Sequence, residues 1–173
     1  MKKIVFPVKN GDIEKLKAGE EVAISGIIYS ARDRAHKKFI ETLKKGKNLP
    51  IPLKNSLIYY MGPSPAPPGK IIGSCGPTTS IRMDTFTIPL LKIGLKGMMG
   101  KGKRSEEIVK ACKKHKAVYF ITYGGCGAYL SKFVKSFKVA AYQELGPEAV
   151  YELVVENFPA IVGIDTYGNS IFR

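Results

Sequence analysis

The chain contains, at residues 105–122, the stretch SEEIVKACKKHKAVYFIT, whose pattern is that of a helix followed at once by a strand. Ser105 can cap a helix that runs to His115, with two glutamates in its first turn and two lysines in its last. Residues 117–122 are mostly apolar, which favours a buried strand. A helix that leads directly into such a strand is typical of a sheet with helices packed on it.

The same alternation extends over much of the chain. We expect strands at 3–7, 21–30, 57–61, 138–142 and 160–165, one that ends at 71–72, and a short strand or turn at 97–100. We expect helices at 12–18, 32–44, 80–92 with a kink near Pro89, and 147–157, where Pro147 suits the first helical position. The pattern predicts an α/β fold with a parallel or mixed sheet. A length of 173 residues predicts a single domain over 1–173.

Composition narrows the class of protein. The chain is 45% hydrophobic and 24% charged, which argues against disorder. No apolar run approaches the roughly 20 residues that a membrane span needs. The basic start MKKIVFPVKNGD has too short an apolar run for a signal peptide. We therefore expect a cytoplasmic protein that does not insert into a membrane.

The net charge is +14, from 28 lysines and arginines against 14 acidic residues. Such a charge points to an acidic partner: a nucleic acid, an anionic metabolite or an acidic protein. The aromatic residues are scattered rather than interleaved with basic ones, so a single-strand nucleic-acid platform is not indicated. The charge alone does not distinguish an anionic metabolite from an acidic protein or another nucleic acid as the partner.

The three cysteines, Cys75, Cys112 and Cys126, are widely spaced. An odd number without a secretory signal indicates a reducing compartment. The spacings lack the compact pattern usual for iron–sulfur ligands, and Cys112 falls within the expected helix, where a buried thiol is the ordinary role. We expect this chain to bind no metal through them.

A candidate anion site lies in Gly73-Ser-Cys-Gly-Pro-Thr-Thr-Ser-Ile-Arg-Met-Asp84. A glycine-rich turn that opens a helix directs free backbone N–H groups outward. Arg82, one turn later, adds a charged fork suited to a carboxylate or phosphate. Taken alone, the stretch is equally compatible with an ordinary helix cap beside a solvated arginine.

Two further turns carry basic residues. In Ser30-Ala-Arg-Asp-Arg-Ala-His36, Arg32 stands at a helix start, where a cation is unfavourable unless an anion is present, and His36 shares its helical face. In Gly97-Met-Met-Gly-Lys-Gly-Lys-Arg-Ser105, Lys101 precedes another helix start, whereas Arg104 reads as part of a solvated basic turn. Because such turns gather at the carboxyl ends of strands, Arg32, Arg82 and Lys101 can converge on one small dianion.

Two other loops have less specific patterns. The proline-rich stretch at 62–69 is either a stiff linker or a rigid loop beside a site, and we favour the loop. The glycine-rich turn at 124–127 is read as close backbone packing.

Taken together, these motifs resemble those of the β subunit, or C-terminal domain, of class I fumarases and L(+)-tartrate dehydratases. The matching stretches are RDRAH (32–36), YYMGPSPAPPGK (59–70), IGSCGPTTSIRMD (72–84), GKGKRS (100–105), GGCGA (124–128) and GPEAVYELVVENFPAIVGIDTYGNSIF (146–172). They span nearly the whole chain, and the first and third are the most specific.

The resemblance implies a swivelling β/β/α domain with a central parallel or mixed sheet, a second antiparallel sheet and helices. It implies a hydro-lyase that converts fumarate to L-malate with an α subunit that holds the [4Fe-4S] cluster. Arg32, Arg82 and Lys101 would bind the substrate carboxylates. Thr78 would be the base and His36 an active-site group, with Thr79 and Asp84 supporting them.

The resemblance leaves several points open. L(+)-tartrate is an alternative substrate, because few contacts read one extra hydroxyl. A basic nucleic-acid-binding module is the alternative that is not an enzyme. It is disfavoured because the motif residues cluster at turns and do not run along one face of a helix or strand. We expect a homodimer or an α2β2 assembly, with no nucleic acid bound. Three site cations do not account for the whole charge of +14.

Overall fold

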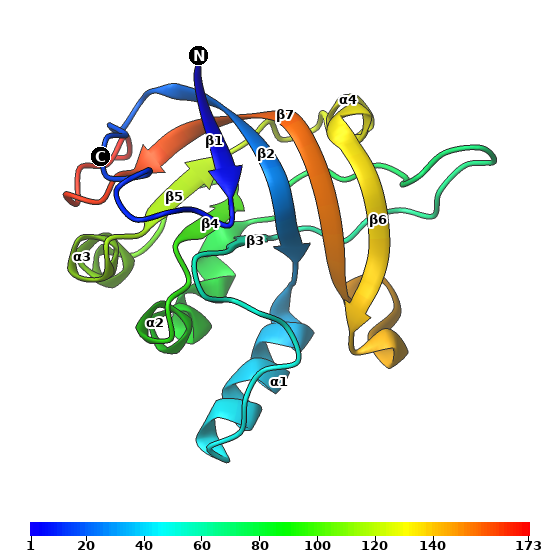
Figure 1. Ribbon diagram of the computed structural model, residues 1–173, viewed down its shortest axis with the longest axis horizontal. Helices are drawn as coiled ribbons and strands as arrows, with labels where there is room; N and C mark the ends of the chain where they lie inside the picture. The colour runs from blue at the N-terminus through cyan, green and yellow to red at the C-terminus, as the bar shows by residue number, and fades with distance from the viewer.

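The computed structural model describes all residues, 1–173, and its seven strands form one mixed sheet that closes on itself (Figure 1). The strands are β1 (Lys2–Phe6), β2 (Glu21–Ser30), β3 (Leu57–Tyr59), β4 (Gly97–Gly100), β5 (Val118–Ile121), β6 (Val134–Ala141) and β7 (Val150–Ile164). Their order is β1-β2-β3-β4-β5-β7-β6, and β2 also pairs with β7. Strands β2, β3, β4, β5 and β7 therefore make a closed barrel, with β1 and β6 attached at its side.

The barrel has a parallel side and an antiparallel side. Strands β1 to β5 pair in parallel, whereas β7 runs antiparallel to β2, β5 and β6. The long β7 can pair with three strands because its register shifts opposite Ile24–Gly26, near Asn157, which has a left-handed φ of 52°. Strand β7 thus joins the two ends of the parallel sheet.

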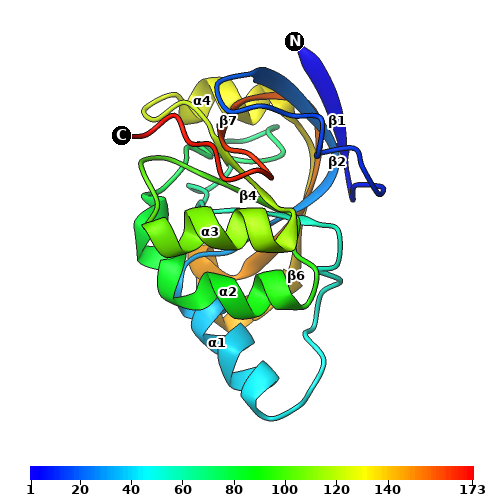
Figure 2. The ribbon, with the colours of Figure 1, turned by 90° about the vertical axis from the view of Figure 1, so that its left-hand side faces the viewer.

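Helices cover one outer face of the parallel side. Figure 2 shows α1 (Asp33–Lys44), α2 (Asp84–Lys92) and α3 (Glu106–His115) stacked as one layer. The short helix α4 (Gly127–Leu130) lies apart from them, near β6. Three 3-10 helices complete the set: η1 (Ser80–Met83), η2 (Ser131–Phe133) and η3 (Gln143–Glu148).

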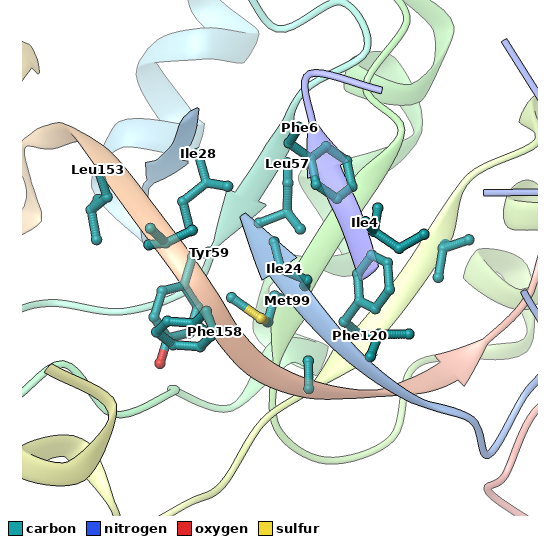
Figure 3. Close-up of a cluster of buried hydrophobic side chains, with 14 of the residues drawn as sticks. Ile4, Phe6, Ile24, Ile28, Leu57, Tyr59, Met99, Phe120, Leu153 and Phe158 are labelled. Carbon is teal, nitrogen blue, oxygen red and sulfur yellow. The ribbon is translucent and has the colours of Figure 1, made fainter. Parts of the chain in front are cut away.

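The side chains of the parallel strands alternate between two hydrophobic cores, one inside the barrel and one under the helices. Successive side chains of a strand point to opposite faces. Leu57 and Tyr59 accordingly point into the barrel, where Figure 3 shows them among Phe120 and Phe158. Ile58, between them, packs under the helices with Phe39 of α1. The three parallel strands β3 to β5 are thus covered on both faces, which explains their nearly continuous apolar sequences.

Several sequence predictions are confirmed. The strand at 21–30, the helix that begins after Arg32 and the helix–strand unit of residues 105–122 are all present. Of the two alternatives for 97–100, the structure has the strand. The predicted helix at 80–92 is η1 followed by α2, and the break lies at Met83–Asp84 rather than at Pro89. The proline-rich stretch is a loop that projects to the right of Figure 1, where Ser64 and Ser74 join the two sides of its base by hydrogen bonds.

Three local predictions are wrong. Residues 12–18 form turns, in which the Asp12 carboxylate accepts a hydrogen bond from the Lys9 N–H. No strand ends at 71–72, because β3 and β4 pair directly and leave no position between them. In place of the predicted helix at 147–157, η3 ends at Glu148 and β7 begins at Val150, because pairing with β2 and β6 outweighs the helix-like spacing of the apolar residues.

The α/β class with a mixed sheet is therefore correct. The second, antiparallel sheet implied by the resemblance is not separate: β6 and β7 are continuous with the parallel strands. None of the helices is both long enough and apolar enough to span a membrane.

Candidate functional site

The carboxyl ends of four parallel strands meet at one edge of the barrel, and each is followed by a motif singled out from the sequence. Arg32 follows β2, the segment from Tyr60 to Gly62 follows β3, Lys101 follows β4, and the glycine-rich turn at 124–127 follows β5. Strands β2 to β5 are neighbours in that order. The topology therefore brings these motifs to one edge, as the convergence argument predicts.

The segment from Thr78 to Ser80 lies across the ends of β3 and β4. The N–H and the hydroxyl of Thr78 both donate to the carbonyl oxygen of Tyr60, at 2.8 and 3.0 Å. The Lys101 N–H donates to the Thr78 carbonyl at 3.2 Å, and the Ser80 N–H donates to the Lys101 carbonyl at 3.0 Å. Thr79 and Lys101 form a parallel bridge, so their side chains point to the same side.

Glycine at position 100 permits this close crossing. A Cβ built on Gly100 would overlap the Ser80 hydroxyl and lie 3.1 Å from the carbonyl oxygen of Thr78. A larger residue would push the crossing segment away from β4. The position of Thr78 beside Lys101 thus depends on a residue without a side chain.

Arg82 connects this segment to α1. Its Nη2 donates to Asp33 Oδ1 at 3.2 Å, and Asp33 is the first residue of α1, directly after Arg32. Both side chains of the pair are substantially exposed, at 46% and 40%. An exposed pair of this kind contributes about 0–1 kcal/mol, so an incoming carboxylate can replace Asp33 at little cost.

Arg32 precedes α1 with an extended backbone and is half-buried. Its guanidinium lies over Gly62, where a Cβ would come 2.5 Å from Nη1 and 3.2 Å from Cδ. The Nε atom is buried and has no hydrogen-bond partner. A buried, unpaired donor is costly, so this arginine is suited to an additional acceptor.

His36 lies behind the edge rather than on it. Its ring is buried and packs against the rings of Phe39, Tyr60 and Phe86. Nδ1 lies 2.7 Å from the Arg32 carbonyl oxygen, which requires a proton on Nδ1. Burial lowers the pKa of His36 to about 4, so the imidazole is neutral near pH 7. In this arrangement His36 supports the backbone of Arg32 and does not reach the surface where the cations lie.

The sequence interpretation missed Arg104. Its side chain is fully buried and its Nε donates to Asp84 Oδ1 at 2.5 Å, whereas the pattern indicates a solvated turn. Asp84 is thus engaged by Arg104 and by the Ser105 N–H, at 2.7 Å, instead of by the site cations. The argument applied to Arg32 also applies to Arg104, because a cation beside a helix start requires an anion.

The cysteines do not fit a metal or cluster site. No group of three or more His, Cys, Asp or Glu side chains is placed to hold a metal ion. Cys75 and Cys112 are buried, and burial raises the pKa of each thiol to about 12, which disfavours the thiolate that such ligation requires. Cys126, in the glycine-rich turn, is exposed.

That turn packs closely, as expected from its glycines. A Cβ on Gly127 would overlap the Ser74 hydroxyl and lie 2.8 Å from the Gly76 N atom. The Gly127 carbonyl accepts a hydrogen bond from the Cys75 N–H at 3.2 Å. The turn thereby supports the start of the 73–84 motif.

The site is an open surface. Arg82 and Lys101 are exposed, and neither they nor Thr78 line any of the main surface hollows. One of these, of about 640 Å³, includes Ile81 and Arg104 and lies between the start of α3 and the carboxyl terminus. A surface with three cations and a hydroxyl can bind a dicarboxylate, but this chain alone does not enclose one.

Comparison with known proteins gives consistent matches. The chain matches the family described as Fumarase C-terminus over residues 3–173. It is 42% identical over 168 residues to the putative L(+)-tartrate dehydratase subunit beta of Methanocaldococcus jannaschii, covering 94% of this chain and 86% of that protein. It is 40% identical to the aerobic class I fumarate hydratase of Escherichia coli K12 and 39% identical to fumarate hydratase 2 of Leishmania major. These two matches cover 88% and 92% of this chain, but only 28% of each relative.

Proposed function

This chain belongs to the fumarase C-terminus family, and from that membership we propose that it is the β subunit of a hydro-lyase that interconverts fumarate and L-malate. The observation that carries the proposal is the position of Arg32, Arg82 and Lys101 on segments that meet at one edge of the barrel, beside Thr78. A dicarboxylate needs cations at both ends, and this edge supplies three. The closed barrel with one helical layer is, we infer, the swivelling β/β/α arrangement.

Each cation has a distinct part in binding. The Arg82 fork exchanges Asp33 for a substrate carboxylate, and the guanidinium of Arg32, whose Nε–H has no partner, donates to a further carboxylate oxygen. Lys101 adds a point charge on the side to which Thr79 also points. Together they hold the carboxylate next to C3, which makes the C3 proton more acidic.

Thr78 is the proposed base. Its hydroxyl now donates to the Tyr60 carbonyl, which fixes the oxygen in place next to Lys101 in the backbone ladder. A threonine hydroxyl is a poor base, so it can take the C3 proton of malate only as an alkoxide stabilised by nearby cations. Thr79 supports this side of the site, and Asp84 and His36 act from behind it.

A partner subunit follows from the same proposal. The residues of this chain do not fit an iron–sulfur cluster. We assign the [4Fe-4S] cluster to an α subunit, which would cover the open edge in an α2β2 assembly or a simpler heteromer. The Methanocaldococcus relative, named as a subunit beta, is consistent with a separate partner chain. A cytoplasmic location and a single domain over 1–173 belong to this proposal.

L(+)-tartrate is a second candidate substrate. The protein from Methanocaldococcus jannaschii bears that name and is matched over 86% of its length, compared with 28% for the fumarate hydratases. Tartrate has the same two carboxylates as malate and one more hydroxyl. The three cations serve both substrates equally well.

Reconstitution tests the proposal. The purified chain is mixed anaerobically with its α subunit, and the loss of fumarate absorbance or the dehydration of L(+)-tartrate is followed. We expect Arg82→Ala to reduce activity at least tenfold, since a charge-assisted hydrogen bond is worth about 1.5–3 kcal/mol. Arg34→Ala removes an exposed arginine from α1, the helix that begins at the Arg82 partner Asp33, and should leave activity unchanged. Absence of turnover with both substrates would refute the proposal.

A further inference from the structure

Arg104 is a buried cation for which the proposed chemistry has no direct use. Its side chain has no exposed surface, and the guanidinium lies over the rings of Tyr60 and Tyr119, with ring centroids 5.3 and 4.9 Å away. It cannot touch a substrate at the exposed edge. Its role must therefore be exerted through the residues that it contacts.

Those contacts tie α2 to the turn that carries Lys101. Arg104 Nε donates to Asp84 Oδ1 at 2.5 Å, and Nη2 donates to the Thr87 hydroxyl at 3.0 Å. The second oxygen of Asp84 accepts the Ser105 N–H at 2.7 Å. The carboxylate at the start of α2 is thereby bound at two points of the segment that follows β4.

A second connection lies beside the first. The Tyr119 hydroxyl donates to the Gly102 carbonyl at 2.7 Å and lies 2.8 Å from Ser80 Oγ, whose hydroxyl can donate in return. Tyr119 belongs to β5, and its ring lies against Arg104. The two connections together join the 80–84 segment to the 101–105 turn.

We propose that Arg104 is the positioning residue that sets Lys101 and Arg82 at the spacing of a C4 dicarboxylate; this inference rests on the proposed function. Lys101 lies three residues before Arg104, and Arg82 lies two residues before Asp84. Both cations are exposed, so their side chains have little packing of their own to hold them. The buried ion pair supplies a fixed distance between the backbones from which they extend.

Stability alone is a weak reason for this arrangement. Replacing a buried ion pair with apolar residues of similar volume is often neutral or even stabilising, because desolvation offsets the attraction. An arginine fork that holds a carboxylate, a hydroxyl and two aromatic rings instead defines a geometry. Two cations can recognise a dianion of one length only if the distance between them is fixed.

The test measures dicarboxylate binding without turnover. The chain, reconstituted anaerobically with its α subunit, is treated with trinitrobenzenesulfonate, and the labelling rate of each of its lysines is read by peptide mass spectrometry with and without succinate. Succinate should slow the labelling of Lys101 several-fold, whereas propionate at the same carboxylate concentration should not. Lys103, exposed in the same turn, is the internal reference.

The expected result is that Arg104→Met abolishes the protection of Lys101 by succinate and that Arg104→Lys, which keeps the charge beside Asp84, restores part of it. Lys110→Met, at an exposed position of α3, is the control and should retain full protection. Because Arg104→Met leaves Asp84 unpaired and can prevent folding, the double variant Arg104→Met/Asp84→Asn is measured as well. Circular dichroism melting establishes that each variant is folded.

Two results would count against these ideas, and they are distinguishable. If succinate protects Lys101 equally in the unaltered chain and in the folded double variant, Arg104 is not a positioning residue. If succinate fails to protect Lys101 in the unaltered chain, the dicarboxylate site itself is wrong, and the proposed function fails with it.

Discussion

Replacing Gly62 by alanine should displace the guanidinium of Arg32 without unfolding the chain. The new Cβ would lie 2.5 Å from Nη1 and 3.2 Å from Cδ of that arginine, and 3.4 Å from the Pro147 carbonyl oxygen. The overlap involves the flexible end of a side chain, which can move. Gly62 does not have a left-handed φ, so an alanine is compatible with its backbone. The free energy of unfolding should therefore change by less than about 1 kcal/mol.

Substrate binding should change much more. If the guanidinium loses one charge-assisted hydrogen bond to the substrate carboxylate, binding weakens by about 1.5–3 kcal/mol. At 1.4 kcal/mol for each factor of ten, KM should rise roughly 10- to 150-fold. The measurements are a thermal melt of the chain and steady-state kinetics of the reconstituted enzyme.

Gly76→Ala is the matched control for Gly62→Ala. Its Cβ would meet only Gly127, at the ordinary distance of 3.5 Å, so KM should stay close to that of the unaltered enzyme. The reasoning is refuted if Gly62→Ala melts normally and binds substrate with an unchanged KM. In that case Arg32 does not act from its position over Gly62.

Three further predictions concern groups around the site. Burial lowers the pKa of His36 from 6.5 to about 4, so the unfolded chain binds the proton more tightly than the folded chain does. The contribution of neutral His36 to the free energy of unfolding is therefore fully present above pH 6.5. It is lost as the pH falls towards 4, by about 3 kcal/mol in all. In denaturant titrations, the difference in the free energy of unfolding between the unaltered chain and His36→Asn should be constant above pH 6.5 and should shrink as the pH falls below it; a constant difference down to pH 4 would contradict this. Iodoacetamide should label Cys126 in the folded chain and the two buried cysteines only after unfolding, as mass spectrometry can show. Asp33→Asn should remove the competitor of the substrate for Arg82 and lower KM, with a change in stability below about 1 kcal/mol because the pair is exposed; a raised KM would contradict this.

Local signals were sufficient where the element depends mainly on its own residues. The 105–122 unit combines a helix with favourable charges at both ends and an apolar strand, and both form as expected. The same holds for the helix that begins after Arg32, and Arg32 itself follows the carboxyl end of β2. Cys112 is likewise buried on its helix.

Predictions failed where a distant partner decides the conformation. The 147–157 stretch has helical spacing, yet from Val150 it is part of β7, because β2 and β6 offer hydrogen bonds on both of its sides. The sequence pattern indicates that Arg104 is a solvated cation in a basic turn. In the structure it is buried, because it pairs with Asp84, which lies twenty residues earlier in the chain. Neither partner can be identified from the neighbouring residues.

The sequence by itself determined the chemistry available to this protein: cations and a threonine at turns after strands, in motifs that also identify its family. The tertiary structure decided which of these groups share a surface, because the carboxyl ends of β2 to β5 coincide only when these distant segments pair in parallel as neighbours in one sheet. It also decided their separate roles. Arg82 and Lys101 stay exposed at the edge, whereas His36 and Arg104 are buried behind it, since burial depends on how the helical layer packs and not on the residue type.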